Sequence, residues 1–191
     1  MTKLRPRFKF CSFENYKITN PKQKAIVDTL RAWVKDFAPE ETENGFIFLG
    51  NPGTGKNHLT AAIVRDIEKN KYSWEIEKCC DLLARIRKTW NPESLATEDE
   101  IIREYRLVDL LVIDDAHIGP NSDKDREYLY RIIDYRCDYF RPTILTANCN
   151  LDSLSLAIGP WCIDRIYRAG GKNLIFDWQS HRPTPEAKSN A

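Results

Sequence analysis

The chain has 191 residues, of which 42% are hydrophobic and 30% are charged, and its formal net charge is +1. This composition is typical of a soluble globular domain that is large enough to bury its own core. The charge excludes a basic field over the whole surface, so a contact with DNA requires a local patch. The sequence has no run of about 18 apolar residues, so we expect no membrane-spanning helix.

The six cysteines, at positions 11, 79, 80, 137, 149 and 162, are expected to be reduced. No two of them form a CxxC pair, and their spacing fits no zinc site. Four of them, Cys79, Cys137, Cys149 and Cys162, lie beside apolar runs, as buried free thiols do. We therefore expect a reducing, cytoplasmic compartment.

Residues 1–10 are predicted to form a mobile basic arm. The arm carries four cations and no acid, at Lys3, Arg5, Arg7 and Lys9. It lacks the apolar segment of a signal peptide. Two interpretations of the arm stay open: a solvated tail, or a contact with a phosphate group or a partner protein.

The first third of the chain predicts a helix, a strand and a second helix. Apolar residues at helical spacing predict a helix over residues 22–37. An acidic loop over 38–45 leads to an apolar run at 45–50, which is typical of a buried strand. The apolar residues of 59–67 return to helical spacing. The glycine-rich segment between this strand and this helix lies where a phosphate-binding loop is found.

Four further strands are predicted, at 74–76, 107–115, 141–148 and 173–178. Two more amphipathic helices are predicted, over 79–90 and around 129–133, whereas 91–100 is interpreted as a polar break. Because continuous apolar strands alternate with helices, we predict an α/β fold with a parallel five-stranded sheet and helices on both faces. The domain is expected to span 11–182, with a flexible tail at 183–191.

The segment GNPGTGKNH, residues 50–58, has the spacing of a phosphate-binding loop. Glycines let the backbone turn tightly, and the helix that follows adds partial positive charge at its N-terminus. Lys56 is expected to reach the β- and γ-phosphates of ATP. We expect the nucleotide to contact the whole segment: Gly50, Asn51, Pro52, Gly53, Thr54, Gly55, Lys56, Asn57 and His58.

Asn57 stands where phosphate-binding loops usually have Ser or Thr as a ligand of Mg²⁺. An amide oxygen is also a hard ligand, and Mg²⁺ keeps several water molecules in any case. We therefore expect Asn57 to remain at the metal and to weaken or reshape the metal site.

Two acids, Asp114 and Asp115, end the most apolar predicted strand, as in a Walker B motif. Asp114 is expected to hold the metal and Asp115 to polarise the attacking water, with a simple strand end as the alternative. Most such motifs have Glu at the second position, and a shift of about 1 Å in a catalytic group costs about 10²-fold in rate. Asn148, after the next strong strand, is expected to orient the same water, with a turn residue as the alternative.

Several segments together follow one known pattern: GNPGTGKNHLTAAI, RFKFCSFENY, LVDLLVIDDAHIG, RPTILTANCN, IDRI and FDWQSHR. They resemble the DnaC-type bacterial helicase loaders, which belong to the AAA+ ATPases together with the IstB transposition helpers. Those loaders share the Asn after the lysine, so the resemblance implies that Asn57 is a mark of the family. It covers residues 7–182 and implies a P-loop AAA+ core.

The resemblance also implies roles for residues outside these loops. Phe13 and Tyr16 fall where such proteins wall the adenine pocket, with core aromatics as the alternative. Arg165 matches an arginine finger that reaches the ATP of a neighbouring subunit, with Arg168 as a second candidate and a structural ion pair as the alternative. The implied cofactors are ATP and Mg²⁺. The implied partners are further copies of the chain, the replicative helicase or a full-length loader, and single-stranded DNA.

The sequence departs from the loader pattern in three places. Gly159-Pro160-Trp161 stands where relatives often have Gly-Glu-Arg, so one arginine expected at a subunit contact is missing. Asp115 replaces the usual Glu. Loaders also carry a helical helicase-binding domain ahead of the ATPase core, and we expect this chain to lack it.

Binding of single-stranded DNA needs cations along a groove and flat rings for stacking. Two clusters offer them: Lys124 with Arg126, and Tyr139 and Phe140 with Arg141. The alternative for each cluster is a solvated helix face or a core edge.

Together these features predict a slow ATPase that resembles a helicase loader and acts as an oligomer on the replicative helicase or on single-stranded DNA. Three alternatives stay open: a truncated regulator that inhibits a full-length loader, a transposition helper, and a nucleotide-binding switch without hydrolysis.

Overall fold

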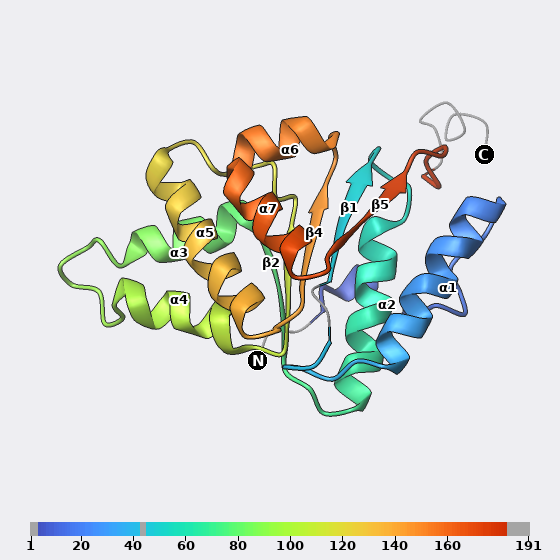
Figure 1. Cartoon of the computed structure of the whole chain (residues 1–191), viewed down its shortest axis with the longest axis horizontal. Coiled ribbons are helices and arrows are strands. Elements are labelled where there is room, and N and C mark those ends of the chain that lie inside the picture. The colour runs from blue at the N-terminus through green and yellow to red at the C-terminus, as the bar shows by residue number, and fades with distance from the viewer. Residues whose placement is uncertain (1–3, 43–44, 183–191) are drawn as a thin grey trace.

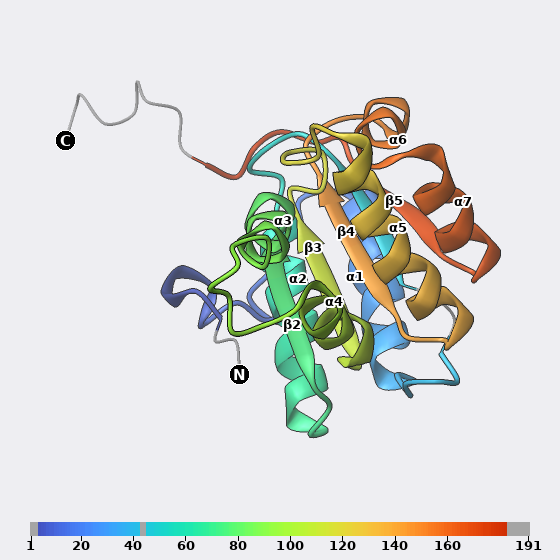
Figure 2. The same ribbon diagram turned by 90° about the vertical axis from the view of Figure 1, so that its left-hand side faces the viewer.

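The computed structural model of the chain describes residues 4–42 and 45–182. A single sheet of five parallel strands runs through this part, in the order β2-β3-β4-β1-β5. Figure 2 shows β2, β3 and β4 side by side. The strands are β1 (Phe46–Gly50), β2 (Trp74–Lys78), β3 (Leu110–Asp114), β4 (Thr143–Ala147) and β5 (Lys172–Phe176). The predicted α/β fold with a parallel five-stranded sheet is confirmed.

Helices cover both faces of the sheet, as predicted (Figure 1). One face is covered by α1 (Pro21–Lys35) and α2 (Lys56–Lys69). The other face packs against α3 (Cys79–Lys88), α4 (Glu98–Leu107), α5 (Asp123–Asp138), α6 (Leu151–Ile158) and α7 (Pro160–Arg168). None of these helices in the described residues is long and apolar enough to cross a membrane.

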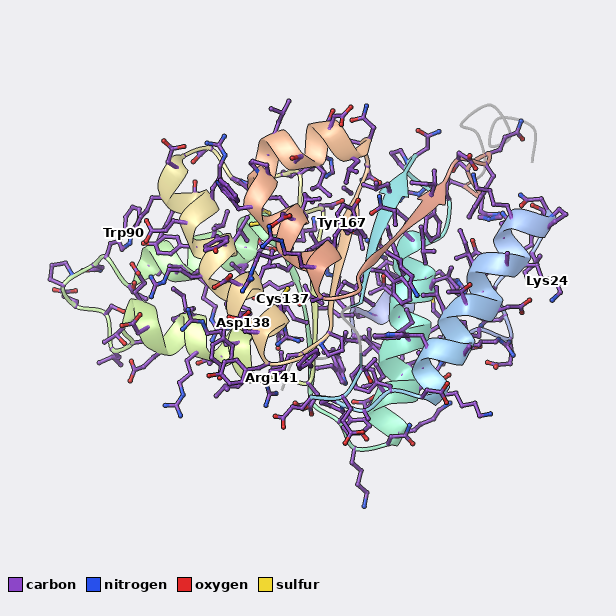
Figure 3. All side chains as sticks on the ribbon, in the orientation of Figure 1. Lys24, Trp90, Cys137, Asp138, Arg141 and Tyr167 are labelled. Atoms are coloured by element: carbon purple, nitrogen blue, oxygen red, sulfur yellow. The ribbon has the colours of Figure 1, made fainter. Side chains whose placement is uncertain are left out.

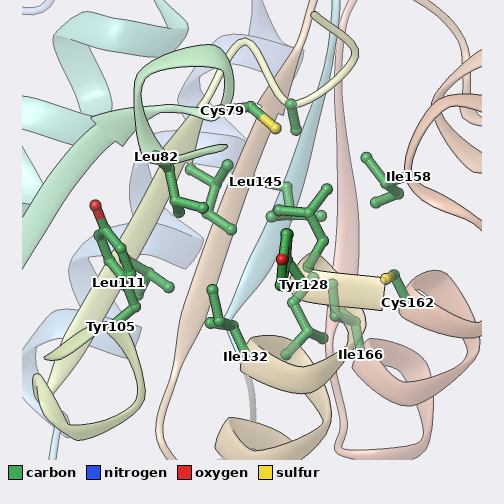
Figure 4. Close-up of a cluster of buried hydrophobic side chains, with 14 of the residues drawn as sticks. Cys79, Leu82, Tyr105, Leu111, Tyr128, Ile132, Leu145, Ile158, Cys162 and Ile166 are labelled. Atoms are coloured by element: carbon green, nitrogen blue, oxygen red, sulfur yellow. The ribbon is translucent and has the colours of Figure 1, made fainter. Parts of the chain in front are cut away.

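Successive residues of the central strands point to opposite faces of the sheet and so pack into two separate hydrophobic cores. Phe48 of β1 packs with α1 and α2, whereas its neighbour Leu49 lies in the cluster with α3–α7. Figure 4 shows this second cluster, in which Leu111 and Leu145 of the sheet face helical residues such as Tyr128. Because both faces are buried, the central strands are apolar at consecutive positions.

The interpretation of residues 91–100 as a polar break is wrong at its end, because α4 begins at Glu98. Thr97 caps this helix: its hydroxyl accepts the Glu100 N–H at 3.3 Å, and the Glu100 carboxylate accepts the Thr97 N–H at 2.8 Å. This pair is a capping box, which a sequence can reveal as Thr followed three residues later by Glu. The buried Ile101 and Ile102 then follow on the helix.

Helices α6 and α7 are also absent from the sequence-based prediction. Both are short, and they meet at Gly159, whose φ of 92° allows the chain to turn between them. Asn150 caps α6 by accepting the Ser153 N–H at 2.9 Å, and Pro160 begins α7. Eight or nine residues give too few helical repeats to be recognised from apolar spacing.

The thiol prediction holds for three of the four cysteines beside apolar runs. Cys79, Cys137 and Cys162 are buried, and all six cysteines are free. Burial raises the pKa of the Cys137 and Cys162 thiols to about 12. Cys149 is only half-buried.

Arg136 of α5 is completely buried and holds three elements together. Its guanidinium donates to the carbonyl oxygens of Tyr105 at 2.9 Å, Val108 at 2.7 Å and Pro142 at 2.6 Å, and to the Thr143 hydroxyl at 3.0 Å. Two of these carbonyls lie at the C-terminal end of α4, where the helix dipole favours a cation. The side chain therefore fixes α4 and α5 against the start of β4.

Replacing Arg136 by Met is expected to lower the free energy of unfolding by about 3–5 kcal/mol, because several buried carbonyl groups lose their donor. Arg136→Lys should lower the free energy of unfolding by less, since lysine keeps the positive charge but not the planar set of donors. Urea unfolding followed by circular dichroism measures both. Arg103→Met, on the exposed face of α4, is the matched control and should change the free energy by less than about 0.5 kcal/mol. Equal losses in Arg136→Met and Arg103→Met would contradict the role of Arg136.

Candidate nucleotide-binding site

The carboxyl ends of three neighbouring parallel strands bring the predicted site residues together. The glycine-rich loop connects β1 to α2, Asp114 ends β3, and Asn148 follows β4, which lies between the other two strands. A cleft of about 440 Å³ opens at this edge. Its lining residues are Arg7, Phe8, Cys11, Pro52, Gly53, Gly55, Lys56, Asn57, His58, Lys78, Asp114, Asp115, Asn148, His181 and Arg182.

Two glycines give the loop a shape that other residues do not fit. Gly53 and Gly55 have φ of 81° and 100°, in the left-handed region. A Cβ atom on Gly53 would lie 2.1 Å from the Ser180 hydroxyl, and one on Gly55 would lie 2.5 Å from the Tyr16 ring. Because α2 begins at Lys56, the N–H groups of its first turn lack partners within the helix and suit a bound phosphate.

Lys56 is the buried cation of the loop, with an exposed fraction of 5%. Its ammonium donates to the carbonyl oxygens of Gly50 at 2.6 Å and Asn51 at 2.9 Å. An ammonium has three donors, so one remains for a phosphate oxygen. Burial lowers the pKa of Lys56 to about 8, although the carboxylates of Asp115 and Asp114 act in the opposite direction.

Asp114, at the end of β3, is hydrogen-bonded to both α2 and β4. The Asn57 amide donates to one of its oxygens at 3.2 Å, and the Thr146 hydroxyl donates to the other at 2.6 Å. With its NH₂ group facing Asp114, Asn57 keeps its amide oxygen for another partner. A carboxylate and an amide oxygen are ligands that suit Mg²⁺, which takes the rest of its shell from water and phosphate. Thr146 has no role in the sequence-based prediction, although a polar side chain in an apolar strand is a signal for one.

Asp115 and Asn148 lie together beside this pair. The Asn148 amide donates to the Asp115 carboxylate at 3.0 Å, and the Asp115 N–H donates to the Thr146 hydroxyl at 3.0 Å. Asp115 has a φ of 51°, a left-handed conformation that Asp tolerates better than most residues. The two side chains predicted to act on one water molecule are thus hydrogen-bonded to each other.

Residues from both ends of the chain brace the glycine-rich loop from outside. The Tyr16 hydroxyl and the Trp178 indole N–H both donate to the Thr54 carbonyl oxygen, at 3.1 and 2.9 Å. The His181 N–H donates to the Gly53 carbonyl oxygen at 2.8 Å. These bonds hold the loop in place before a ligand binds.

The structure separates the two aromatics predicted for the adenine pocket. Tyr16 lies against the loop and lines a hollow of about 600 Å³ that shares Gly55, His58 and His181 with the cleft. This hollow suits a nucleoside beside bound phosphates. Phe13 is buried in the core with α1 and α2 and lines neither the cleft nor the hollow, which favours its alternative as a core aromatic.

Two cations of the cleft, Lys78 and Arg182, have no predicted role, and for a third, Arg7, a phosphate contact of the arm was one of two interpretations. Arg182 ends the segment FDWQSHR, and its charge adds to the burial of Lys56 in lowering the pKa of that ammonium. Arg7 belongs to the basic arm. Arg7 and Phe8 are the residues of the described arm that line the cleft, whereas Lys3 and the predicted tail at 183–191 fall outside the described residues.

Arg165, the predicted arginine finger, lies on α7 and forms ion pairs with two acids of α5. It contacts Asp134 at 2.5 Å and Asp138, which Figure 3 labels near the C-terminal end of α5. Arg168 pairs with Asp164 at 2.9 Å. Neither arginine lines the cleft of its own chain.

The two clusters predicted to bind DNA lie at opposite ends of α5. Lys124 pairs with Glu127 at 3.1 Å and Arg126 with Asp123 at 2.7 Å, both in the first turns. Tyr139 and Phe140 are exposed just beyond the other end. Their neighbour Arg141 pairs with Glu40 at 2.7 Å. A helix of 16 residues separates the clusters by about 24 Å, so they do not form one continuous patch.

Comparisons with known proteins agree with this architecture. The family described as IstB-like ATP binding protein matches residues 1–161. The replicative helicase loader DnaC of Escherichia coli strain K12 is 32% identical over 179 residues, which are 94% of this chain and 72% of the loader. A crystal structure of the DnaC helicase loader superposes with a TM-score of 0.78 at 26% identity, covering 90% of this chain and 99% of that one.

A crystal structure of DnaI also superposes with a TM-score of 0.78, at 19% identity and with 94% of each chain covered. The matches confirm the resemblance to DnaC-type loaders and the predicted P-loop AAA+ architecture.

Binding of Mg·ATP is expected to take up a proton at alkaline pH, because a triphosphate raises the pKa of Lys56 from its value of about 8 in the free protein. At pH 7 Lys56 is largely protonated before binding, so uptake should be near zero. At pH 9 it should approach about one proton per site. Calorimetry in buffers of different ionisation enthalpy measures the uptake.

Lys56→Arg is the control for this titration, because a guanidinium stays protonated over the whole range. Any binding that this variant retains should be free of proton uptake at pH 9. Equal uptake in the parent and in Lys56→Arg would assign the proton to another group.

Proposed function

The chain belongs to the IstB-like ATP-binding protein family, and on this premise we propose that it is a helicase-loader-like ATPase that acts in DNA replication. One observation carries the proposal. Lys56, Asn57 and Asp114 lie in a single cleft, with Asp115 and Asn148 beside them. The identity to the DnaC loader over 94% of the chain supports the replication context.

The cleft contains the groups that phosphoryl transfer to water requires. The loop N–H groups and Lys56 would bind the phosphates, and Asn57 and Asp114 would hold Mg²⁺. A bound Mg²⁺ neutralises negative charge on the phosphates. Asp115, held by Asn148 at 3.0 Å, would accept a hydrogen bond from the attacking water and align it. Because Asp reaches less far than Glu, we expect slow hydrolysis.

Full activity of the proposed ATPase requires a second copy of the chain. Arg165 lies outside its own cleft, so it would serve the ATP of a neighbouring subunit. To do so it must exchange the carboxylates of Asp134 and Asp138 for phosphate oxygens. An isolated subunit keeps these ion pairs, which gives a physical reason for low activity without a neighbour.

The replicative helicase and single-stranded DNA are the partners we propose for the assembled form. The DNA patch would be completed by neighbouring subunits, because one subunit separates its two candidate clusters along α5.

A regulator of a full-length loader is the second candidate, favoured by the surface of α7. Trp161 is 69% exposed there, where relatives often have Arg, and Leu156 of α6 is also exposed. An apolar surface close to Arg165 would bind a loader subunit without completing its catalytic site. Such a protein would bind the loader and not the helicase.

Asp115→Asn is expected to lower ATP hydrolysis by about 10²-fold while ATP affinity stays within about twofold, because a neutral amide polarises the attacking water far less than a carboxylate does. Asp115→Glu should raise hydrolysis, since it restores the usual reach. Single-turnover hydrolysis of labelled ATP with Mg²⁺ measures both. Unchanged hydrolysis in Asp115→Asn would leave a nucleotide-binding switch as the better description.

Mixing two inactive variants tests whether Arg165 acts across a subunit contact. Lys56→Ala lacks a working loop and Arg165→Ala lacks the finger, so each should be inactive alone. In a mixture, the loop of one variant can meet the intact Arg165 of the other, and ATP hydrolysis should recover. Arg168→Ala is the matched control and should stay active without a partner variant. A mixture that remains inactive would argue for a structural role of Arg165.

A further inference from the structure

The two residues that directly follow the basic arm are bound to α2, the helix that follows the glycine-rich loop. Arg65 of α2 donates to the Cys11 carbonyl oxygen at 3.0 Å, and the His58 ring donates to the Ser12 carbonyl oxygen at 2.9 Å. Because α2 begins at Lys56, these two bonds set the position of the arm relative to the loop. The described part of the arm therefore extends from a segment that is bound beside the site.

From this anchor the arm reaches the cleft. Its 3-10 helix, η1 (Pro6–Phe8), places Arg7 and Phe8 in the cleft wall, in the same lining as Lys56. Phe8 also lines a smaller cavity that ends at Asn57 and Asp114. The arm therefore borders both the phosphate side and the expected metal side of the site.

Arg7 brings a positive charge that no acid among the described residues neutralises. No ion pair within residues 4–42 and 45–182 involves Arg7. Its guanidinium lies 4.4 Å from the centre of the Phe8 ring, a cation–π contact that orients it on the arm. The acids of the cleft have other partners, since Asp114 is bound by Asn57 and Thr146.

We propose that Arg7 binds the polyphosphate of the nucleotide held by its own subunit. This inference rests on the proposed function, because its ligand is the ATP of that cleft. A triphosphate carries several negative charges. Lys56 already donates two of its three N–H groups to the carbonyls of Gly50 and Asn51, so it has one left for the phosphates. A guanidinium presents paired donors that match phosphate oxygens.

Arg7 acts on the phosphates and not on the nucleoside. The hollow that suits the nucleoside is bordered by Tyr16 and Trp178, and Arg7 is not among its lining residues. Arg7 therefore favours triphosphates over a monophosphate. The backbone of a nucleic acid offers the same chemical group, so the experiment includes single-stranded DNA as a second ligand.

The test compares Arg7→Ala with Lys9→Ala, which removes the same charge from an exposed residue of the arm that does not line the cleft. Affinity is measured with a fluorescent ATP analogue and Mg²⁺, and by its displacement with ATP, inorganic triphosphate or AMP. Arg7→Ala should lower the affinity for ATP and for inorganic triphosphate by about tenfold and leave the affinity for AMP unchanged. Lys9→Ala should stay within about twofold of the parent, and Arg7→Lys should recover part of the loss.

Equal ATP affinity in Arg7→Ala and the parent would overturn the proposal and leave the proposed function intact. Equal losses of ATP affinity in Arg7→Ala and Lys9→Ala would also overturn it, because they would reflect the total charge of the arm. An equal loss of affinity for AMP would overturn it too, because it would reflect a deformed cleft. If Arg7→Ala lowered the affinity for single-stranded DNA alone, Arg7 would bind the nucleic acid backbone instead. A parent that binds no ATP would contradict the proposed function itself, and this inference with it.

Discussion

Three neighbouring parallel strands end at one edge of the sheet, and the remaining structure depends on that alignment. β4 pairs with β1 on one side and β3 on the other, so the loops that follow them share a small volume. Parallel strands need helical crossovers, which explains why both faces are covered and why the strands are apolar throughout. The hydrogen bonds of Asp114 to Asn57 and Thr146 then join the three strand ends across this edge.

The glycine-rich loop is held by segments that are far away in the sequence. Tyr16 and Trp178, separated by most of the chain, donate to the same carbonyl oxygen of Thr54. Lys56, which follows this loop, is itself buried, and burial lowers the pKa of its ammonium to about 8. Burial thus reduces the protonated fraction of Lys56 at alkaline pH. Two cations from the ends of the described chain, Arg7 and Arg182, lie in the same cleft.

Charged groups elsewhere are largely engaged within the subunit. Arg165 is held by two acids of α5, and Arg136 is buried among carbonyl groups at the end of α4. Arg165 can exchange these two carboxylates for an anion from another molecule, since its side chain is 25% exposed. The role of Arg136 is structural, because no solvent reaches Arg136. Burial therefore distinguishes an arginine available for assembly from one that maintains the fold.

The sheet, the loop and the acids that face it could be predicted from the sequence, because strand ends, glycine spacing and apolar runs are local patterns. The Thr97 cap of α4 is also a local pattern, but the acidic first turn of that helix resembles a continuation of the polar break. Three further outcomes are visible in the folded chain alone: that Tyr16 and not Phe13 meets the loop, which acids hold Arg165, and that Arg7 reaches the cleft. Those outcomes depend on contacts between distant segments, and local periodicity carries no information about which distant side chains pack together.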